Sequence, residues 1–143
     1  MNATTDLTQI YKGSLSKAKR GIAIADKKYV VVRDEIETLP GETTVRWTLL
    51  TPTEVKITGT NKAELIKNGK KLILQVQEPA NVVIKTWPTD PPHSYDAPNP
   101  GTTLVGFEIT LPPNVERTIT VTLVPQSAEK DVKKKMLALS KWN

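Results

Sequence analysis

The sequence contains no cysteine and only one histidine among its 143 residues. The absence of cysteine excludes disulfide bonds, thiolate zinc sites and cysteine nucleophiles. A zinc site without cysteine needs three or four histidine or carboxylate ligands at a suitable spacing, and that spacing is absent. No serine lies in a nucleophile-elbow glycine pattern, and no glycine-rich loop with a lysine is present to hold a phosphate. We therefore expect no metal and no cofactor.

Long hydrophobic runs are also absent. No apolar stretch approaches the roughly 20 residues that a membrane helix needs, so we expect no membrane span. Residues 1–6 lack a basic start followed by an apolar segment, so they are not a signal peptide, and the chain is either cytoplasmic or part of a longer exported one. With 38% hydrophobic and 24% charged residues, the composition is that of one globular domain. The net charge of +5 favours anionic partners or serves only solubility.

Apolar and polar side chains alternate along most of the chain, which places successive side chains on opposite faces of a strand. The clearest predicted strands lie at residues 44–49, 72–76, 105–111 and 118–123, with others at residues 29–36 and 82–87. Asn68-Gly69, between two such runs, predicts a hairpin, because a type I′ turn needs positive φ at both central positions. Residues 26–28 form another polar turn. About nine or ten short strands predict an all-β fold, an antiparallel β-sandwich of two sheets.

Two stretches depart from this pattern. Residues 86–103 are crowded with prolines, which cannot donate to a β-ladder, so we predict a long proline-rich loop. Residues 126–143 form a basic tail, which we interpret as an arm docked through Leu139 and Trp142, with about one helical turn, or as a short helix. We therefore divide the chain into a sandwich domain at residues 1–125 and a tail at residues 126–143.

Three groups of residues resemble segments of heparinase II/III-like proteins. The first group is Lys19-Arg20-Gly21-Ile22-Ala23, Asp26–Val32 and Asp34-Glu35-Ile36, and the last is Leu139–Trp142 at the end of the tail. The most specific group lies between them, in and after the proline-rich loop, and consists of Trp87, Pro91-Pro92, Tyr95-Asp96-Ala97-Pro98-Asn99-Pro100-Gly101 and Gly106-Phe107-Glu108. The resemblance covers nearly the whole chain.

The resemblance implies a secreted or periplasmic bacterial lyase that cleaves acidic, glycosaminoglycan-type polysaccharides by β-elimination. In that family a helical toroid precedes β-sandwich layers, and the catalytic tyrosine and histidine residues lie upstream of any position in this chain. The resemblance therefore implies a non-catalytic domain that packs against the catalytic toroid, and no catalytic residue can be assigned here. The alternative is a binding module that holds an anionic, sulfated or uronic-acid glycan through a basic face.

Two sets of side chains are candidates for contact with such a glycan. Lys17, Lys19 and Arg20, with the tail lysines, are candidate partners for sulfates or uronates, and the alternative is a solvated charged face. His93 and Tyr95 are either a pair that touches substrate or ordinary loop residues, with Tyr95 packing on Pro91 or Pro92; we favour the second interpretation. Nucleic acid is not expected, because no stacking aromatics interleave with the lysines.

The remaining motif residues have a structural interpretation. In the loop motif of Trp87, Tyr95, Asp96, Pro98, Asn99, Pro100 and Gly101, the X-Pro steps and a glycine free to take positive φ fix a rigid loop that re-enters the sheet. Such a loop can brace a neighbouring domain. Aromatic residues are only 5% of the chain, and we expect Trp47 in the core and Trp87 at a packed corner.

Overall fold

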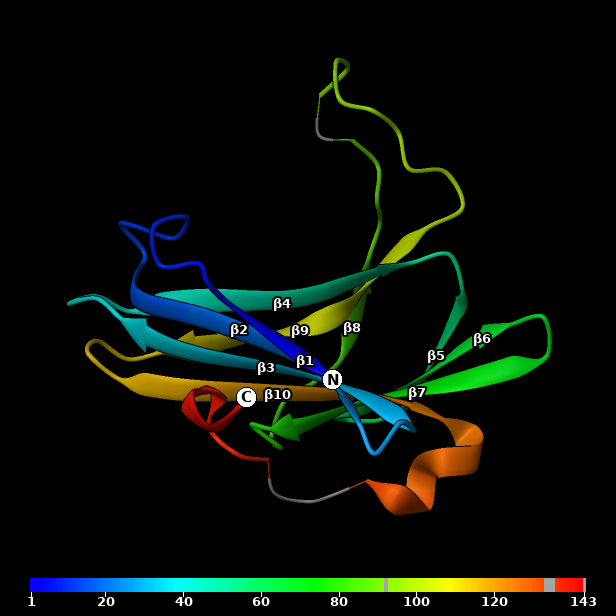
Figure 1. Cartoon of the computed structure of the whole chain (residues 1–143). Helices are drawn as coiled ribbons and strands as arrows, with labels where there is room; N and C mark the ends of the chain where they lie inside the picture. The colour runs from blue at the N-terminus through cyan, green and yellow to red at the C-terminus, as the bar shows by residue number, and fades with distance from the viewer. Residues whose placement is uncertain (92, 133–135, 143) are drawn as a thin grey trace.

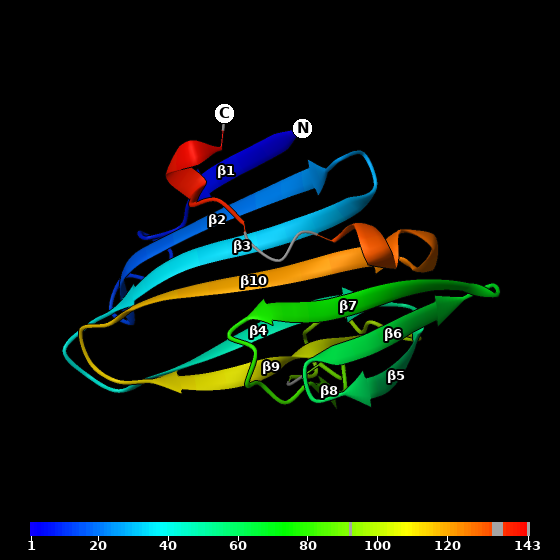
Figure 2. The same ribbon diagram turned by 90° about the horizontal axis from the view of Figure 1, so that it is seen from below.

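The computed structural model describes residues 1–91, 93–132 and 136–142. Seven strands form a large antiparallel sheet in the order β1-β2-β3-β10-β7-β6-β5. Their bounds are β1 Asn2–Asp6, β2 Leu15–Ala25, β3 Tyr29–Thr38, β5 Glu54–Gly59, β6 Lys62–Lys67, β7 Lys70–Glu78 and β10 Glu116–Pro125. Figure 2 shows these strands side by side across one layer of the molecule.

A second sheet of three strands, β4 (Thr43–Thr51), β9 (Thr103–Leu111) and β8 (Lys85–Trp87), packs on one face of the large sheet. Figure 1 shows β4, β9 and β8 as a layer above β2, β3 and β10. The prediction of an antiparallel β-sandwich is therefore confirmed. No helix in the described part of the chain is long and apolar enough to cross a membrane.

The two predicted tight turns are present, and the Asn68-Gly69 turn has the backbone geometry that its sequence predicts. Asn68 and Gly69 join β6 to β7 with φ of 51° and 72°, and Asp26 and Lys27 join β2 to β3 with φ of 51° and 57°. Positive φ at both central positions matches the right-handed twist of the flanking strands. These turns fix the register of both hairpins, and that register decides which side chains face the small sheet.

The main core lies between the two sheets. Trp47 on β4 is 5% exposed and stacks on Phe107 of β9, with ring centroids 6.0 Å apart. The large sheet contributes alternate residues such as Leu74, Val76 and Val121, which are fully buried. The expectation that Trp47 belongs to the core is confirmed.

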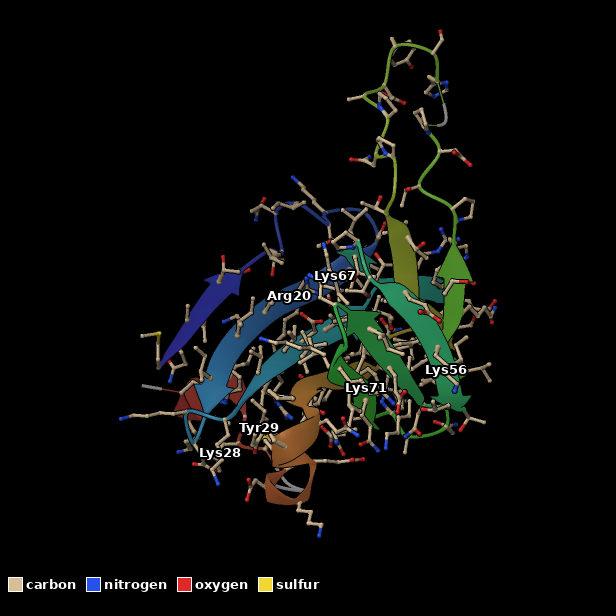
Figure 3. The ribbon with its side chains drawn as sticks, turned by 90° about the vertical axis from the view of Figure 1, so that its right-hand side faces the viewer. Arg20, Lys28, Tyr29, Lys56, Lys67 and Lys71 are labelled. Atoms are coloured by element: carbon tan, nitrogen blue, oxygen red, sulfur yellow. The ribbon has the colours of Figure 1, made fainter. Side chains whose placement is uncertain are left out.

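The tail covers the opposite face of the large sheet. The 3₁₀ helices η1 (Gln126–Asp131) and η2 (Leu139–Lys141) make it a docked arm. A second cluster joins Tyr29, Val31 and Ala128, and Figure 3 shows Tyr29 beside η1. The Leu139 amide donates to Glu35 Oε1 at 2.8 Å. The predicted cations Lys133, Lys134 and Lys135 lie outside the described residues.

The strand predicted at residues 82–87 is wrong in extent, because only Lys85–Trp87 pairs, as β8. Val82 and Ile84 are buried in the core. The Ile84 amide donates to the Thr60 carbonyl at 2.7 Å, in the turn between β5 and β6. Burial of these two apolar side chains and the hydrogen bond to Thr60 hold residues 82–84 in place without a β-ladder. Alternation of apolar and polar residues alone does not distinguish such an unpaired segment from a paired strand.

Candidate functional site

The proline-rich loop projects beyond the sandwich as a long excursion between β8 and β9 (Figure 1). Its base is cross-braced by hydroxyl groups: Thr89 Oγ1 donates to the Thr102 carbonyl at 3.0 Å, and Thr102 Oγ1 donates to the Asn99 carbonyl at 2.7 Å. Gly101 has φ of 72°, the left-handed conformation expected for it. The loop therefore leaves and re-enters the sheet through a fixed base.

The tip of the loop carries the candidate pair His93 and Tyr95. The two rings stack with centroids 5.0 Å apart and an interplanar angle of 17°, and Tyr95 is 81% exposed. Tyr95 therefore stacks on His93, and the interpretation that Tyr95 packs on Pro91 or Pro92 stays a prediction. Pro92 lies outside the described residues. No hydrogen bond or ion pair in the described ranges joins either side chain to a lysine or arginine. The backbone of Asp96 closes the tip, with its amide donating to the His93 carbonyl at 3.1 Å.

Trp87 stands at the base of the loop and contacts a charged cluster on the outer face of the small sheet. The Arg46 guanidinium lies 4.9 Å from the centroid of the Trp87 ring, a cation–π contact. Arg46 also pairs with Glu108 at 2.7 Å, and Lys85 lies 3.6 Å from the same carboxylate. The hydrogen bond from Arg46 lowers the pKa of Glu108 below its ordinary value. Trp87 thus packs at a corner, as the sequence predicted.

The three candidate cations of β2 do not form one patch. Lys19 and Arg20 are adjacent on a strand, so their side chains leave opposite faces of the sheet. Lys17 lies 3.7 Å from Glu116, and Lys19 lies 3.7 Å from Asp6. Each lysine therefore pairs with a different carboxylate on the surface, whereas the Arg20 side chain faces the small sheet.

Arg20 forms a two-pronged ion pair with Asp34 on the neighbouring strand. Its Nε donates to Asp34 Oδ1 at 2.6 Å, and its Nη2 donates to Oδ2 at 2.8 Å. The Asp34 side chain is 9% exposed and that of Arg20 is 38% exposed. The hydrogen bond to Asp34 raises the pKa of Arg20, which keeps the guanidinium protonated. The bidentate geometry fixes the plane of the guanidinium.

The Arg20–Asp34 pair lines a cavity of about 220 Å³ between β2, β3 and β4. The segment that joins β1 to β2 also contributes to its wall. Tyr11, Ser14 and Trp47 also line this cavity. The indole Nε1 of Trp47 is buried and has no hydrogen-bond partner among the described residues. We name this space the Arg20 cavity.

Sequence reasoning found Arg20 but missed Asp34, Trp47 and Tyr11 as lining residues. Strand alternation places Ala18 and Arg20 on one face of β2, and Asp34 and Ile36 on the matching face of β3. Their register across the hairpin was therefore the signal that could have paired Arg20 with Asp34. In the described part of the chain, no three histidine or carboxylate side chains gather where a metal ion could be held.

No protein-family model and no curated protein matches the chain. Solved structures of heparinase III and of a heparan sulfate lyase do contain its fold. A heparinase III, the BT4657 gene product, matches with a TM-score of 0.66 and 16% identity, over 87% of this chain and 19% of that chain. A second heparinase III matches with a TM-score of 0.59 and 18% identity, over 83% of this chain and 19% of that chain. The heparan sulfate lyase HepC from Pedobacter heparinus matches with a TM-score of 0.58 and 16% identity. That match covers 78% of this chain and 18% of the HepC chain.

The chain therefore has the fold of a domain of heparinase II/III-like lyases. It spans about a fifth of the length of the lyase chains that it matches. At this level of identity the likeness shows the fold, and activity has to be argued from the site.

Proposed function

We propose that this chain is a non-catalytic β-sandwich domain of a heparinase III-like polysaccharide lyase, which packs against the catalytic domain and supports it. The observation that carries the proposal is the asymmetry of the structural matches, which cover most of this chain but about a fifth of each lyase. The parent enzyme would cleave acidic polysaccharides by β-elimination. Its proposed location is the periplasm or the exterior of a bacterial cell.

The described side chains support the absence of catalysis. β-Elimination at a uronic acid needs a base, an acid and a group that neutralises the carboxylate, all within reach of one sugar. His93 lies at an exposed loop tip with Tyr95 as its ring partner. Arg20, which lines the cavity, is engaged by Asp34. His93 and Tyr95 therefore lie apart from Arg20, and in the described part of the chain no histidine joins Arg20 and Tyr11 in the Arg20 cavity.

The proline-rich loop is the proposed contact with the catalytic domain. It projects from the sandwich, and the hydroxyl groups of Thr89 and Thr102 brace its base. A loop that is rigid before contact loses little conformational entropy when it packs against a partner. This property suits a permanent brace between domains.

The coding sequence that flanks this chain tests the supporting role. We expect it to encode a helical toroid domain, either in the same reading frame or in the adjacent one, because a supporting domain must be made together with the domain that it supports. Flanking sequence without such a domain on either side would contradict the proposal.

A second candidate function is the binding of an anionic glycan through a basic face. Lysines of the β5–β7 edge favour it: Lys67 and Lys70 lie opposite each other across the hairpin, and no ion pair of the described residues includes Lys56, Lys67 or Lys70. Figure 3 shows Lys56, Lys67 and Lys71 on these strands. Unpaired lysines attract sulfates and carboxylates by releasing counterions, whereas the predicted cations Lys17 and Lys19 already face carboxylates.

A further inference from the structure

We propose that the free edge of β4 pairs with an extended strand from the part of the lyase polypeptide that lies outside this chain. Naming the lyase as the source of the strand rests on the proposed function, whereas the pairing itself rests on the sandwich. Three features of the sandwich carry it: an edge strand without protection, an uncovered apolar strip beside that edge, and an open space along it.

The first feature is the free edge of β4. This strand pairs with β9 in an unbroken register over all nine of its residues, and no strand in the described part of the chain pairs with its other side. Amides and carbonyls of an antiparallel strand point alternately to its two sides, so alternate residues of β4 turn theirs away from β9. No backbone hydrogen bond outside the β4–β9 ladder involves β4 among the described residues. A further strand could therefore take up these groups.

β4 also lacks the protection that the other three sheet edges have. Native edge strands are usually kept from pairing by short length, a lysine, a proline or a bulge. β1 has five exposed residues, β8 has three and precedes Pro88, and β5 has Lys56 and a shift of register. The nine residues of β4 include no proline, glycine or lysine, and its one charged side chain, Arg46, pairs with Glu108 of β9. The composition of β4 is thus that of a strand with a neighbour on both sides.

The second feature is an apolar strip of β2 that the small sheet leaves uncovered. Ala18, Ile22 and Ile24 lie on the face of β2 that is turned toward the small sheet. Ala18 is 3% exposed, whereas Ile22 and Ile24 are 48% and 45% exposed. Val32, which lies opposite Ile22 on β3, belongs to the core. Cover by the small sheet therefore ends between β3 and β2 along this stretch, and a strand added beside β4 would lie over the two isoleucines.

The third feature is the course of the Arg20 cavity. Five consecutive residues of β4, at positions 43–47, line it. Because adjacent side chains of a strand point to opposite faces, a space that meets five residues in a row runs along the backbone edge. Leu15, Ala18 and Ile36 form an apolar part of its lining. The cavity thus offers main-chain groups on one side and apolar surface on another, which suits a strand with alternating apolar side chains.

The room beside β4 fits one strand and not a second copy of this chain. The large sheet continues past β3 with β2 and β1, and Figure 2 shows these two strands to one side of the small sheet. A second copy that paired through its own β4 would bring its own β2 and β1 against them. A single extended segment meets no such obstacle. The chain spans about a fifth of the lyases that it matches, so in such a lyase most of the polypeptide lies outside it.

Amide exchange of the wild-type chain, followed residue by residue in ¹⁵N–¹H spectra, tests the pairing. The probe is the peptide acetyl-Thr-Val-Thr-Val-Thr-Val-Lys-amide, whose valines share one face of a strand. We expect alternate β4 amides to exchange fast in the free chain and about tenfold or more slowly with saturating peptide. The same peptide with proline in place of its central valine lacks that donor and should give no protection. Slow exchange of every β4 amide in the free chain, or no slowing by the first peptide, would overturn the proposal.

A double substitution, Ile22→Lys with Ile24→Lys, tests the apolar strip. The new charges would lie beneath the added strand, so we expect peptide binding to weaken by about tenfold or more. Ile57→Lys is the matched control, because Ile57 is 47% exposed but lies on β5, at the far edge of the large sheet. Its affinity for the peptide should match that of the wild type. Equal affinity in the double variant and the wild type would refute a role for the strip.

Sedimentation of the wild-type chain distinguishes the two possible occupants. We expect a monomer, and a dimer with protected β4 amides would assign the edge to a second copy and refute the proposal. The source of the strand is tested apart from the pairing, because the supporting role is examined through the flanking coding sequence. Protection by the peptide, together with flanking sequence that lacks a toroid domain, would support the pairing and refute its source. A toroid domain without any protection of β4 would refute the pairing and leave the supporting role intact.

Discussion

Replacing Gly106 with alanine is expected to destabilise the fold by about 4 kcal/mol or more, which is large for a single substitution. A Cβ at this position would clash with the backbone carbonyl oxygen of Trp47 and lie 2.9 Å from Thr48 Cα. Both atoms belong to β4, which is hydrogen-bonded to β9. Backbone cannot move aside as a flexible side chain can, so β4 and β9 would have to separate.

Gly106 holds more than one strand pair in place. It lies opposite Thr48 of β4 on one side and Lys85 of β8 on the other. Separation at this point would displace Trp47, which lines the Arg20 cavity, and Trp87, from which the proline-rich loop departs. The variant is therefore expected to disturb the positions of both neighbours of β9.

Urea denaturation followed by circular dichroism measures this effect. Gly41→Ala is the matched control, since nothing lies within 4 Å of its added Cβ, and we expect its free energy of unfolding to stay close to the wild-type value. A Gly106→Ala protein within about 1 kcal/mol of the wild type would show that the two strands tolerate a side chain there, contrary to the packing described.

Removal of residues 126–143 is expected to lower the free energy of unfolding by about 3 kcal/mol or more. The tail buries Ala128 and Leu139 and covers Tyr29 and Val31 on the outer face of the large sheet. Fully burying one large apolar side chain stabilises a fold by roughly 1.5–3 kcal/mol. The shortened chain would also expose an apolar patch and is expected to self-associate.

Thermal unfolding measures the effect of the tail, with an expected fall in Tm of roughly 10 °C for a domain of this size. The matched control is Lys130→Gln with Lys141→Gln, which removes two exposed charges of the tail and keeps its apolar contacts. The control should unfold at the wild-type temperature. An unchanged Tm in the shortened chain would mean that the tail does not stabilise the sandwich.

Local features of the fold were predictable because they depend on neighbours in the sequence. Alternation located most strands, and the residue types of Asn68 and Gly69 predicted a hairpin whose backbone has the required positive φ. The proline-rich loop followed from the missing amide hydrogens of its prolines. Each of these inferences needs information from only a few adjacent residues.

Features that depend on distant pairing were not predictable in the same way. Nothing local assigns three strands to one sheet and seven to the other. The Arg20 cavity needs β4 to lie over β2 and β3, so Asp34 and Trp47 became part of the site only through the fold. Lys17, Lys19 and Arg20 look like one cluster in the sequence, and strand alternation, together with Asp34, divides them. The short length of β8 also depends on distant contacts, because Val82 and Ile84 pack in the core and do not pair in the sheet.

The proposed lack of catalysis is tested most directly by incubating the purified chain with heparan sulfate and other uronic-acid polysaccharides. The ultraviolet absorbance of the unsaturated uronate product reports β-elimination, and a heparinase III serves as the positive control. We predict no increase above the rate without protein, because His93 lies at the loop tip, in a different part of the described structure from Arg20 and Tyr11. Steady formation of unsaturated product, lost when His93 is replaced by alanine, would contradict the account.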